Sequence, residues 1–169
     1  RSDAKQSWAA DISAKITPPV SAGGLVYVAA VDQHTIHALA EKDGKQQWTF
    51  TAGGRIDSPP TLHAGSVIFG CADGYVYSVD AGSGELAWKF SAAPEERMIM
   101  NDGQVESAWP VHGSVLIVND TLYCLAGRSL FLDGGMHLSL LNPKTGELLS
   151  SRKHSDIDPA TGKSMQLSN

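Results

Sequence analysis

Apolar residues in this chain come in short runs separated by glycine, proline, aspartate and asparagine. The runs are four to seven residues long and rich in β-branched and aromatic side chains, as at 25–31 and 67–71. No stretch of ten or more residues keeps the 3.6-residue period of an amphipathic helix. Runs of this length and composition are typical of β-strands, so the pattern predicts an all-β protein.

The strand pattern itself repeats. Trp8, Trp48 and Trp88 recur every 40 residues, and Gly44 and Gly84 each stand four positions before the second and third tryptophan. Four short strands in about 40 residues is the period of a β-propeller blade, which needs neighbouring blades to cover its faces. We therefore expect a partial β-propeller of about three to four four-stranded antiparallel blades.

One phrase carries a family resemblance. It occurs at 38–48 and 78–88, and a degenerate copy at 142–150 has Ser150 in place of tryptophan. The phrase resembles the tryptophan-docking motif, Ala-x-Asp-x-x-Thr-Gly-Lys-x-x-Trp, of quinoprotein-like (pyrroloquinoline quinone repeat) β-propellers. Similar repeats occur in outer-membrane assembly lipoprotein propellers and in planctomycete-type PQQ-like repeat proteins. In that family each tryptophan packs on the glycine turn of an adjacent blade, and the matching residues here are Trp8, Gly44, Trp48, Gly84, Trp88 and Gly146.

The repeat divides the chain into parts of a single partial propeller, 1–169. We expect the last strand of a preceding blade at 1–17, blades at 18–50, 58–90 and 114–154, and a surface insertion or tail at 155–169. The side chains expected in the core are Val26, Val28, Leu39, Trp48, Val67, Phe69, Val79, Trp88, Leu116, Val118, Leu138 and Leu140.

The third copy is longer than the others, because Gly84 and Gly146 are 62 residues apart rather than 40. The excess lies at 91–113, before the first strand of the third blade, and at 127–135, between its middle strands. In an antiparallel blade these two connections emerge at the same rim, so both should crown one face of the propeller. Loops on a rigid scaffold often carry function, so we expect the site there.

The candidate binding residues come from these two segments: Arg97, Glu106, Trp109, His112, Arg128 and Asp133. Arginine offers a bidentate fork and tryptophan a stacking face, a combination that suits an anionic or sugar-like ligand. The alternative is structural. Arg128 and Asp133 would then form an ion pair within their loop, and Trp109 would cover the open end of the third blade.

Composition narrows the function classes. The chain has 169 residues, 42% hydrophobic and 18% charged, with a formal net charge of −5. Its 13 lysines and arginines are scattered rather than clustered, which argues against a nucleic-acid partner. No apolar stretch approaches the roughly 18 residues of a membrane span. Two cysteines, Cys71 and Cys124, are too few for a disulfide framework.

The resemblance also admits an enzyme, part of a pyrroloquinoline-quinone-dependent dehydrogenase that uses calcium. Such enzymes resemble one another in a vicinal cysteine pair, and neither Cys71 nor Cys124 has a cysteine neighbour. Only His34 and His37 are close among the histidines, and strand alternation places them on different faces. We therefore expect no catalytic residue, no metal and no cofactor, although an enzyme stays open as the alternative.

The favoured function is a non-catalytic scaffold or recognition module that binds a protein or glycan through one loop-crowned face. The resemblance implies a periplasmic or otherwise exported protein. Three blades and a strand cannot close a ring, and exposed sheet edges invite pairing. We therefore expect that the chain is a fragment of a longer polypeptide or that a second copy completes the circle.

Overall fold

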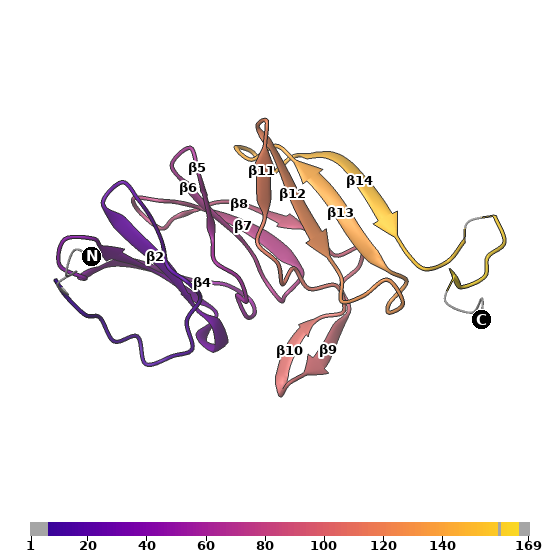
Figure 1. Ribbon diagram of the computed structural model, residues 1–169, viewed down its shortest axis with the longest axis horizontal. Helices are drawn as coiled ribbons and strands as arrows, with labels where there is room; N and C mark the ends of the chain where they lie inside the picture. Colours follow the sequence, from indigo (N-terminus) through magenta and orange to yellow (C-terminus); the bar gives the residue numbers. More distant parts are fainter. Residues whose placement is uncertain (1–6, 159, 166–169) are drawn as a thin grey trace, which may run out of the picture.

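The computed structural model describes residues 7–158 and 160–165, and the regular secondary structure of this part is almost entirely β-strand (Figure 1). The strands of this part are β1 (Val20–Ala22), β2 (Leu25–Ala30), β3 (Thr35–Ala40), β4 (Gln46–Thr51), β5 (Thr61–His63), β6 (Ser66–Gly70), β7 (Tyr75–Asp80), β8 (Leu86–Ser91), β9 (Met98–Asn101), β10 (Gln104–Ser107), β11 (Leu116–Val118), β12 (Thr121–Ala126), β13 (Met136–Leu141) and β14 (Leu148–His154), with a 3-10 turn, η1, at Val31–Gln33.

The strands form three four-stranded antiparallel sheets that lie side by side: β1–β4, β5–β8 and β11–β14 (Figure 1). Within each sheet the strands follow chain order, because short turns join consecutive antiparallel strands. The hairpin β9–β10 forms a separate two-stranded sheet that projects from one edge of the molecule (Figure 1). The expectation of an all-β chain built from four-stranded antiparallel sheets is confirmed.

A glycine turn between the third and fourth strands of each sheet receives a tryptophan from the sheet or segment before it. At Gly84 the backbone φ is +75°, and an added Cβ would lie 2.6 Å from the ring of Trp48. The Trp48 indole N–H donates to the carbonyl of Ala81 at 3.0 Å. Only glycine leaves room for the ring here. The same contact joins Trp8 to Gly44 and Trp88 to Gly146.

Two clusters of buried side chains lie between neighbouring sheets. The cluster between the first and second sheets includes Tyr27, Phe69 and Tyr77, and the rings of the last two are stacked with centroids 5.5 Å apart. The cluster between the second and third sheets includes Leu122 and Trp109. The second sheet is therefore covered on both faces.

The core prediction is confirmed for six of its eight residues in the first two sheets, where Val26 and Trp88 are half-buried, and it is partly wrong for the third. Leu116 and Val118 are 59% and 44% exposed, whereas Leu122 and Cys124 are buried. Leu116 pairs with Tyr123, so it shares the face that points away from the second sheet. The predicted core residues that are buried are Val28, Leu39, Trp48, Val67, Phe69 and Val79, and those half-buried are Val26, Trp88, Leu138 and Leu140.

The segment before the first sheet differs from the expectation of a blade's last strand. No strand forms among residues 7–17, and residues 1–6 lie outside the described part. Ile16 makes an isolated bridge with Ala30, and the N–H of Thr17 donates to the Ala29 carbonyl at 3.0 Å. A strand here would need free backbone groups along a neighbouring strand. Because β1 already pairs with the first half of β2, this segment can bond only to the far end of β2.

The two long segments of the third copy take different forms. Residues 91–113, here called the first insertion, contain the hairpin β9–β10 and the loops on either side of it. Residues 127–135, the second insertion, form an irregular loop between β12 and β13. Beyond β14 the chain makes a turn in which Ile157 bridges Ser164.

Candidate functional site

The two insertions lie against each other at one rim of the sheets, called here the insertion face. The N–H of Gly127, at the start of the second insertion, donates to the Pro110 carbonyl in the first at 3.0 Å. The guanidinium of Arg97 forms an ion pair with Asp133. Residues that are 36 positions apart in the chain are thereby held in contact.

Asp133 is the centre of the first group of candidate residues. Its carboxylate accepts hydrogen bonds from both Arg97 and Arg128, and its backbone carbonyl accepts the indole N–H of Trp109 at 3.1 Å. The Arg97 guanidinium lies over the Trp109 ring, 4.6 Å from its centroid. Trp109 is only 4% exposed, so it offers no free stacking face. Asp133 is one carboxylate against two arginines, and Glu95 supplies a second carboxylate 3.9 Å from Nε of Arg97.

Glu106 and His112 belong to a second group. Glu106 is 1% exposed, and its carboxylate accepts a hydrogen bond from Arg55 at 3.0 Å. Arg55 also lies 3.4 Å from Asp57, which accepts a 2.5 Å hydrogen bond from Nδ1 of His112. That hydrogen bond is the main reason the pKa of Asp57 lies below its ordinary value of 3.8. Arg55 adds to the effect by its charge.

The six predicted residues therefore form two networks rather than one site. Arg55 and Asp57, which hold Glu106 and His112 in place, were missed by the sequence reasoning. Both lie in the connection between β4 and β5, outside the insertions. Their one sequence signal is that this connection enters the first strand of a blade, as the first insertion does, and so reaches the same rim.

The hairpin of the first insertion also reaches the first sheet. Gln104 on β10 lies 3.1 Å from Nε2 of His34 and 3.5 Å from Asp32. His34 follows η1 in a left-handed backbone conformation, with φ of +58°. These contacts hold the hairpin to the β2–β3 connection of the first sheet, which restricts its movement.

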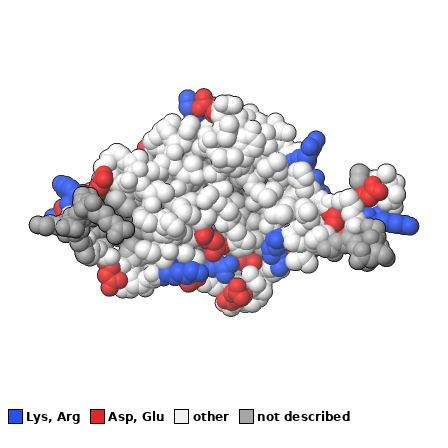
Figure 2. Space-filling model, in the orientation of Figure 1, with Lys and Arg blue, Asp and Glu red and all other residues white. Residues whose placement is uncertain are grey.

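Both insertions expose apolar side chains. Met100, on the hairpin, is 71% exposed, and Phe131 in the second insertion is half exposed. Charged side chains gather along the edge where the hairpin projects, while much of the surface above it is uncharged (Figure 2). The insertion face therefore combines charged groups with exposed apolar ones. The large exposed apolar residues of the two insertions are Met98, Met100, Val105, Leu130, Phe131 and Leu132.

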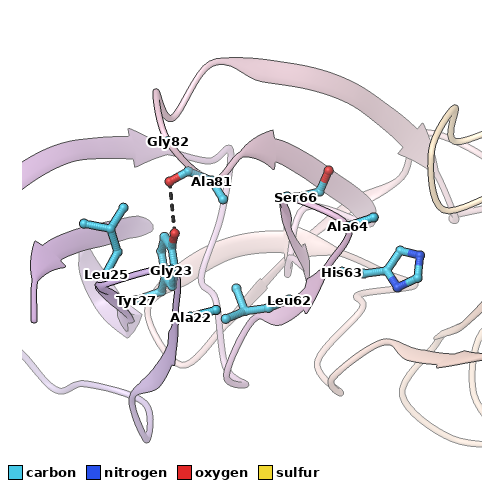
Figure 3. Close-up of a pocket in the computed structure, with 11 residues that line it drawn as sticks. Ala22, Gly23, Leu25, Tyr27, Leu62, His63, Ala64, Ser66, Ala81 and Gly82 are labelled. Atoms are coloured by element: carbon cyan, nitrogen blue, oxygen red, sulfur yellow. Dashed lines mark hydrogen bonds between the residues drawn. The ribbon is translucent and has the colours of Figure 1, made fainter.

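A cavity of about 460 Å³ opens on the opposite rim, where the turns β1–β2 and β5–β6 lie (Figure 3). Its walls are mostly apolar, with Leu25 and Leu62 among them. The Tyr27 hydroxyl donates to the Ala81 carbonyl at 3.0 Å, and the ring of His63 points away from the other side chains drawn in Figure 3. Ser66 also lines the cavity, but the ring of His63 lies against a different group, with Nε2 3.7 Å from the Asp120 carboxylate.

The described residues do not fit a quinone and calcium site. Cys71 is buried just after β6 and Cys124 is buried on β12, and Cys71 donates to the Gly54 carbonyl at 3.2 Å. Burial raises the pKa of the Cys124 thiol to about 12 and also raises that of Cys71. No group of three or more His, Cys, Asp or Glu within 7–158 and 160–165 is arranged to hold a metal ion.

No helix in the described part of the chain has the length and apolar character needed to cross a membrane.

Two of the solved structures that share this fold are alcohol dehydrogenases, and the chain matches only part of each. Quinohemoprotein alcohol dehydrogenase from Comamonas testosteroni has a TM-score of 0.67 and 19% identity, covering 87% of this chain and 22% of that one. Quinohemoprotein alcohol dehydrogenase ADHIIG from Pseudomonas putida HK5 has a TM-score of 0.66 and 18% identity, over 80% and 20% of the two chains. These are β-propellers, so the predicted fold is confirmed; the likeness shows the fold alone.

Sequence comparison gives the family. The outer membrane protein assembly factor BamB of Burkholderia pseudomallei (strain K96243) is 30% identical over 143 residues, which cover 85% of this chain and 33% of the relative. The chain thus spans about a third of that relative's length. The family described as outer membrane protein assembly factor BamB matches residues 1–164. The chain belongs to this family of pyrroloquinoline quinone-type repeat propellers.

Proposed function

We propose that this chain is a non-catalytic recognition module of an exported scaffold protein, and that it binds a protein partner through the insertion face. The repeat sheets would supply a rigid support, and the two insertions would supply the contacts. The name of its relative, an assembly factor for outer membrane proteins, supports a role in holding other proteins together. A periplasmic location belongs to the same proposal.

One observation carries the proposal: the exposed apolar side chains of the insertions have no structural task in the sheets. Met98, Met100 and Phe131 are each half exposed or more, in segments that the two regular repeats lack. Exposed apolar patches with polar surroundings are typical of protein-binding surfaces. Methionine and phenylalanine are also enriched at the centres of such interfaces.

The same face supports a protein partner better than a glycan. A glycan site of the kind considered from the sequence needs an accessible aromatic face and free hydrogen-bonding groups. Here Arg97 covers the ring of Trp109, and Asp133 already accepts from both arginines. A protein partner can instead bury the exposed apolar side chains and leave these ion pairs in place.

Ring completion is a second part of the proposal. Leu116, Val118 and Leu125 are exposed on the outer face of the third sheet, where the first two sheets carry a neighbour on the equivalent face. Another blade, from the same polypeptide or from a second copy, would bury them. Such a contact would use sheet packing and would leave the insertion face free for the partner.

Photo-crosslinking tests which face binds. A benzoylphenylalanine at Phe131, on the insertion face, is compared with one at Ser83, an exposed position in the β7–β8 turn on the opposite rim. We expect one defined protein adduct from position 131 and none from position 83 in the cells that make the protein. Equal adducts from both positions, or none from position 131, would contradict the proposal.

Cofactor binding tests the enzyme alternative. The relative is an assembly factor, and the described residues do not fit quinone and calcium, so we expect no binding. Saturating pyrroloquinoline quinone with calcium should leave the melting temperature unchanged. A rise that depends on both quinone and calcium would favour a dehydrogenase instead.

A further inference from the structure

Within the part of the chain that the structure describes, the outer edge of β9 is unpaired; that of β10 pairs with no strand either, although Ser107 on it donates to the Ala72 carbonyl. Strand β9 pairs with β10 alone, and no other strand lies on its second side in the described residues. Most strand edges in the rest of the structure are interior to a four-stranded sheet. An exposed edge presents backbone donors and acceptors that can pair with another chain.

The register shows which backbone groups this edge presents. Ala108 donates its N–H to the Arg97 carbonyl at 2.8 Å, so these two residues form a hydrogen-bonded pair. The next pair, Ser107 with Met98, is then non-hydrogen-bonded, and Ser107 donates outward to the Ala72 carbonyl at 2.8 Å. By the same alternation the backbone groups of Met98 and Met100 point away from β10. They make no backbone hydrogen bond within the described residues.

The side chains beside this edge are apolar and accessible. Met100 pairs with Val105 and Met98 with Ser107, so Met98, Met100 and Val105 share one face of the hairpin. All three are half exposed or more. Methionine side chains adapt to irregular partners because they are unbranched and flexible. The edge is thus lined by a surface that an added strand would cover.

A cavity of about 230 Å³ lies at the Met98 end of that face, and it is acidic. Asp73, Glu95 and Glu96 line it together with Tyr75 and Met98, and no lysine or arginine does. Two cations lie at its margin. Lys89 lies over the ring of Tyr75, 3.7 Å from its centroid, and Arg97 pairs with Asp133 and also with Glu95, whose carboxylate is 3.9 Å from Nε. Glu96 has no salt bridge in the described residues, so it is the acid most available to a further cation.

We propose that the free edge of β9 pairs with an extended segment of the partner protein, and that a lysine or arginine of this segment enters the acidic cavity. Strand addition to an exposed edge takes its affinity from backbone hydrogen bonds and its specificity from side-chain pockets. Charge complementarity selects a basic segment over an acidic one. This inference rests on the proposed function and names the chemistry of its partner.

A peptide probe tests the edge directly. The probe is acetyl-Thr-Val-Arg-Val-Thr-Val-amide with a fluorescent label, and its matched control has Glu in place of Arg. We expect the basic peptide to bind at least about 10-fold more tightly than the acidic one, the equivalent of about 1.4 kcal/mol. In nuclear magnetic resonance spectra of the intact chain, the amides of Met98 and Met100 should become protected from exchange. Equal affinity for both peptides, or no protection of these amides, would overturn the proposal.

Three variants separate the backbone contribution from the charge contribution. Met100→Pro removes the outward N–H of the edge and should abolish binding, whereas Met100→Ala keeps that N–H and should weaken binding only a few-fold. Proline is tolerated on edge strands, and the exchange measurement on the unmodified chain covers the case in which this variant fails to fold. The double change Glu95→Gln and Glu96→Gln should bring the two peptides to within about threefold of each other. Undiminished binding by Met100→Pro would contradict strand addition.

The outcomes also separate this inference from the function it rests on. If position 131 crosslinks a protein while the peptide does not bind, the insertion face is the binding face and the partner docks as a helix or folded surface. If the crosslinked protein is a second copy of this chain, the inference of a basic partner segment fails. If the peptide binds and position 131 gives no adduct, the hairpin edge is supported and the wider proposal for the face fails.

Discussion

The second sheet and the third sheet have the same strand order but very different surroundings. The second is covered on both faces, and Val67, Phe69 and Val79 on its strands are completely buried. The third has a neighbour on one face only in the described residues, and Leu116 on its other face is largely exposed. It is also the sheet to which both insertions are attached.

The regular and the interrupted parts of the repeat are therefore stabilised in different ways. Where the period is regular, each sheet is secured by the same few devices, a glycine turn and the tryptophan ring packed on it. Where the period is interrupted, the added residues are secured by ion pairs such as Arg97 with Asp133 and leave apolar side chains outside. Under the function proposed above, stability and recognition are placed in different segments.

The largest expected effect is at the docking turn of the second sheet. Gly84→Ala introduces a Cβ 2.6 Å from the Trp48 ring at a φ of +75°, which should destabilise the chain by roughly 2–5 kcal/mol. Gly24→Ala is the matched control, since its φ is +79° and nothing lies within 4 Å of the new Cβ. It should cost only about 1–2 kcal/mol. Urea unfolding measures both, and equal losses would show that the ring contact contributes nothing.

The two faces of the third sheet should respond differently to truncation. Leu122 is completely buried against the second sheet, so Leu122→Ala should cost about 3 kcal/mol in unfolding free energy. Leu116 is 59% exposed, and Leu116→Ala should change it by less than about 0.5 kcal/mol. A comparable loss at Leu116 in a monomeric sample would mean that its face is covered after all.

The ion pairs that connect the two insertions should contribute less to the free energy of unfolding than the Trp48–Gly84 contact or the burial of Leu122. Asp133→Asn removes the acceptor charge shared by Arg97 and Arg128, and it should cost about 1 kcal/mol because the pairs are partly exposed. The loss should shrink in 1 M salt, which screens exposed charges. Asp102→Asn at the exposed hairpin tip is the control and should be neutral. A salt-independent loss would point to packing rather than charge.

The smallest effect concerns pH. The pKa of Asp57 in the folded protein lies below 3.8, chiefly because His112 donates to it, so the ionised carboxylate favours folding. Its contribution is complete above the unfolded value of 3.8 and is lost as the pH falls through the lower folded value. Unfolding measured from pH 5 to pH 3 should therefore show a shallower loss in His112→Gln than in the unchanged chain, by less than about 1 kcal/mol. His154→Gln, at an exposed position on β14, is the control and should not change the slope.

The repeat was enough to predict the fold, because Trp48 and Gly84 mark equivalent positions in successive sheets. Alternation could not assign the faces of the third sheet, where Leu116 and Leu122 are both apolar and only the neighbouring sheet decides which is buried. The sequence predicted that the two insertions meet at one rim, but it did not predict how the candidate residues are arranged there. Glu106 is held by Arg55, which is 51 residues away and lies outside the insertions, and one sequence does not reveal such a pairing.

The proposed division of roles is that the insertions bind the partner and the repeat sheets hold the insertions in place. Hydrogen–deuterium exchange, measured with and without the crosslinked partner, distinguishes these roles. Adding the purified partner should slow exchange in 91–113 and 127–135 and leave the turns of the opposite rim, around Gly24 and Ser83, unchanged. Protection confined to those turns, or spread evenly over the three sheets, would contradict the account.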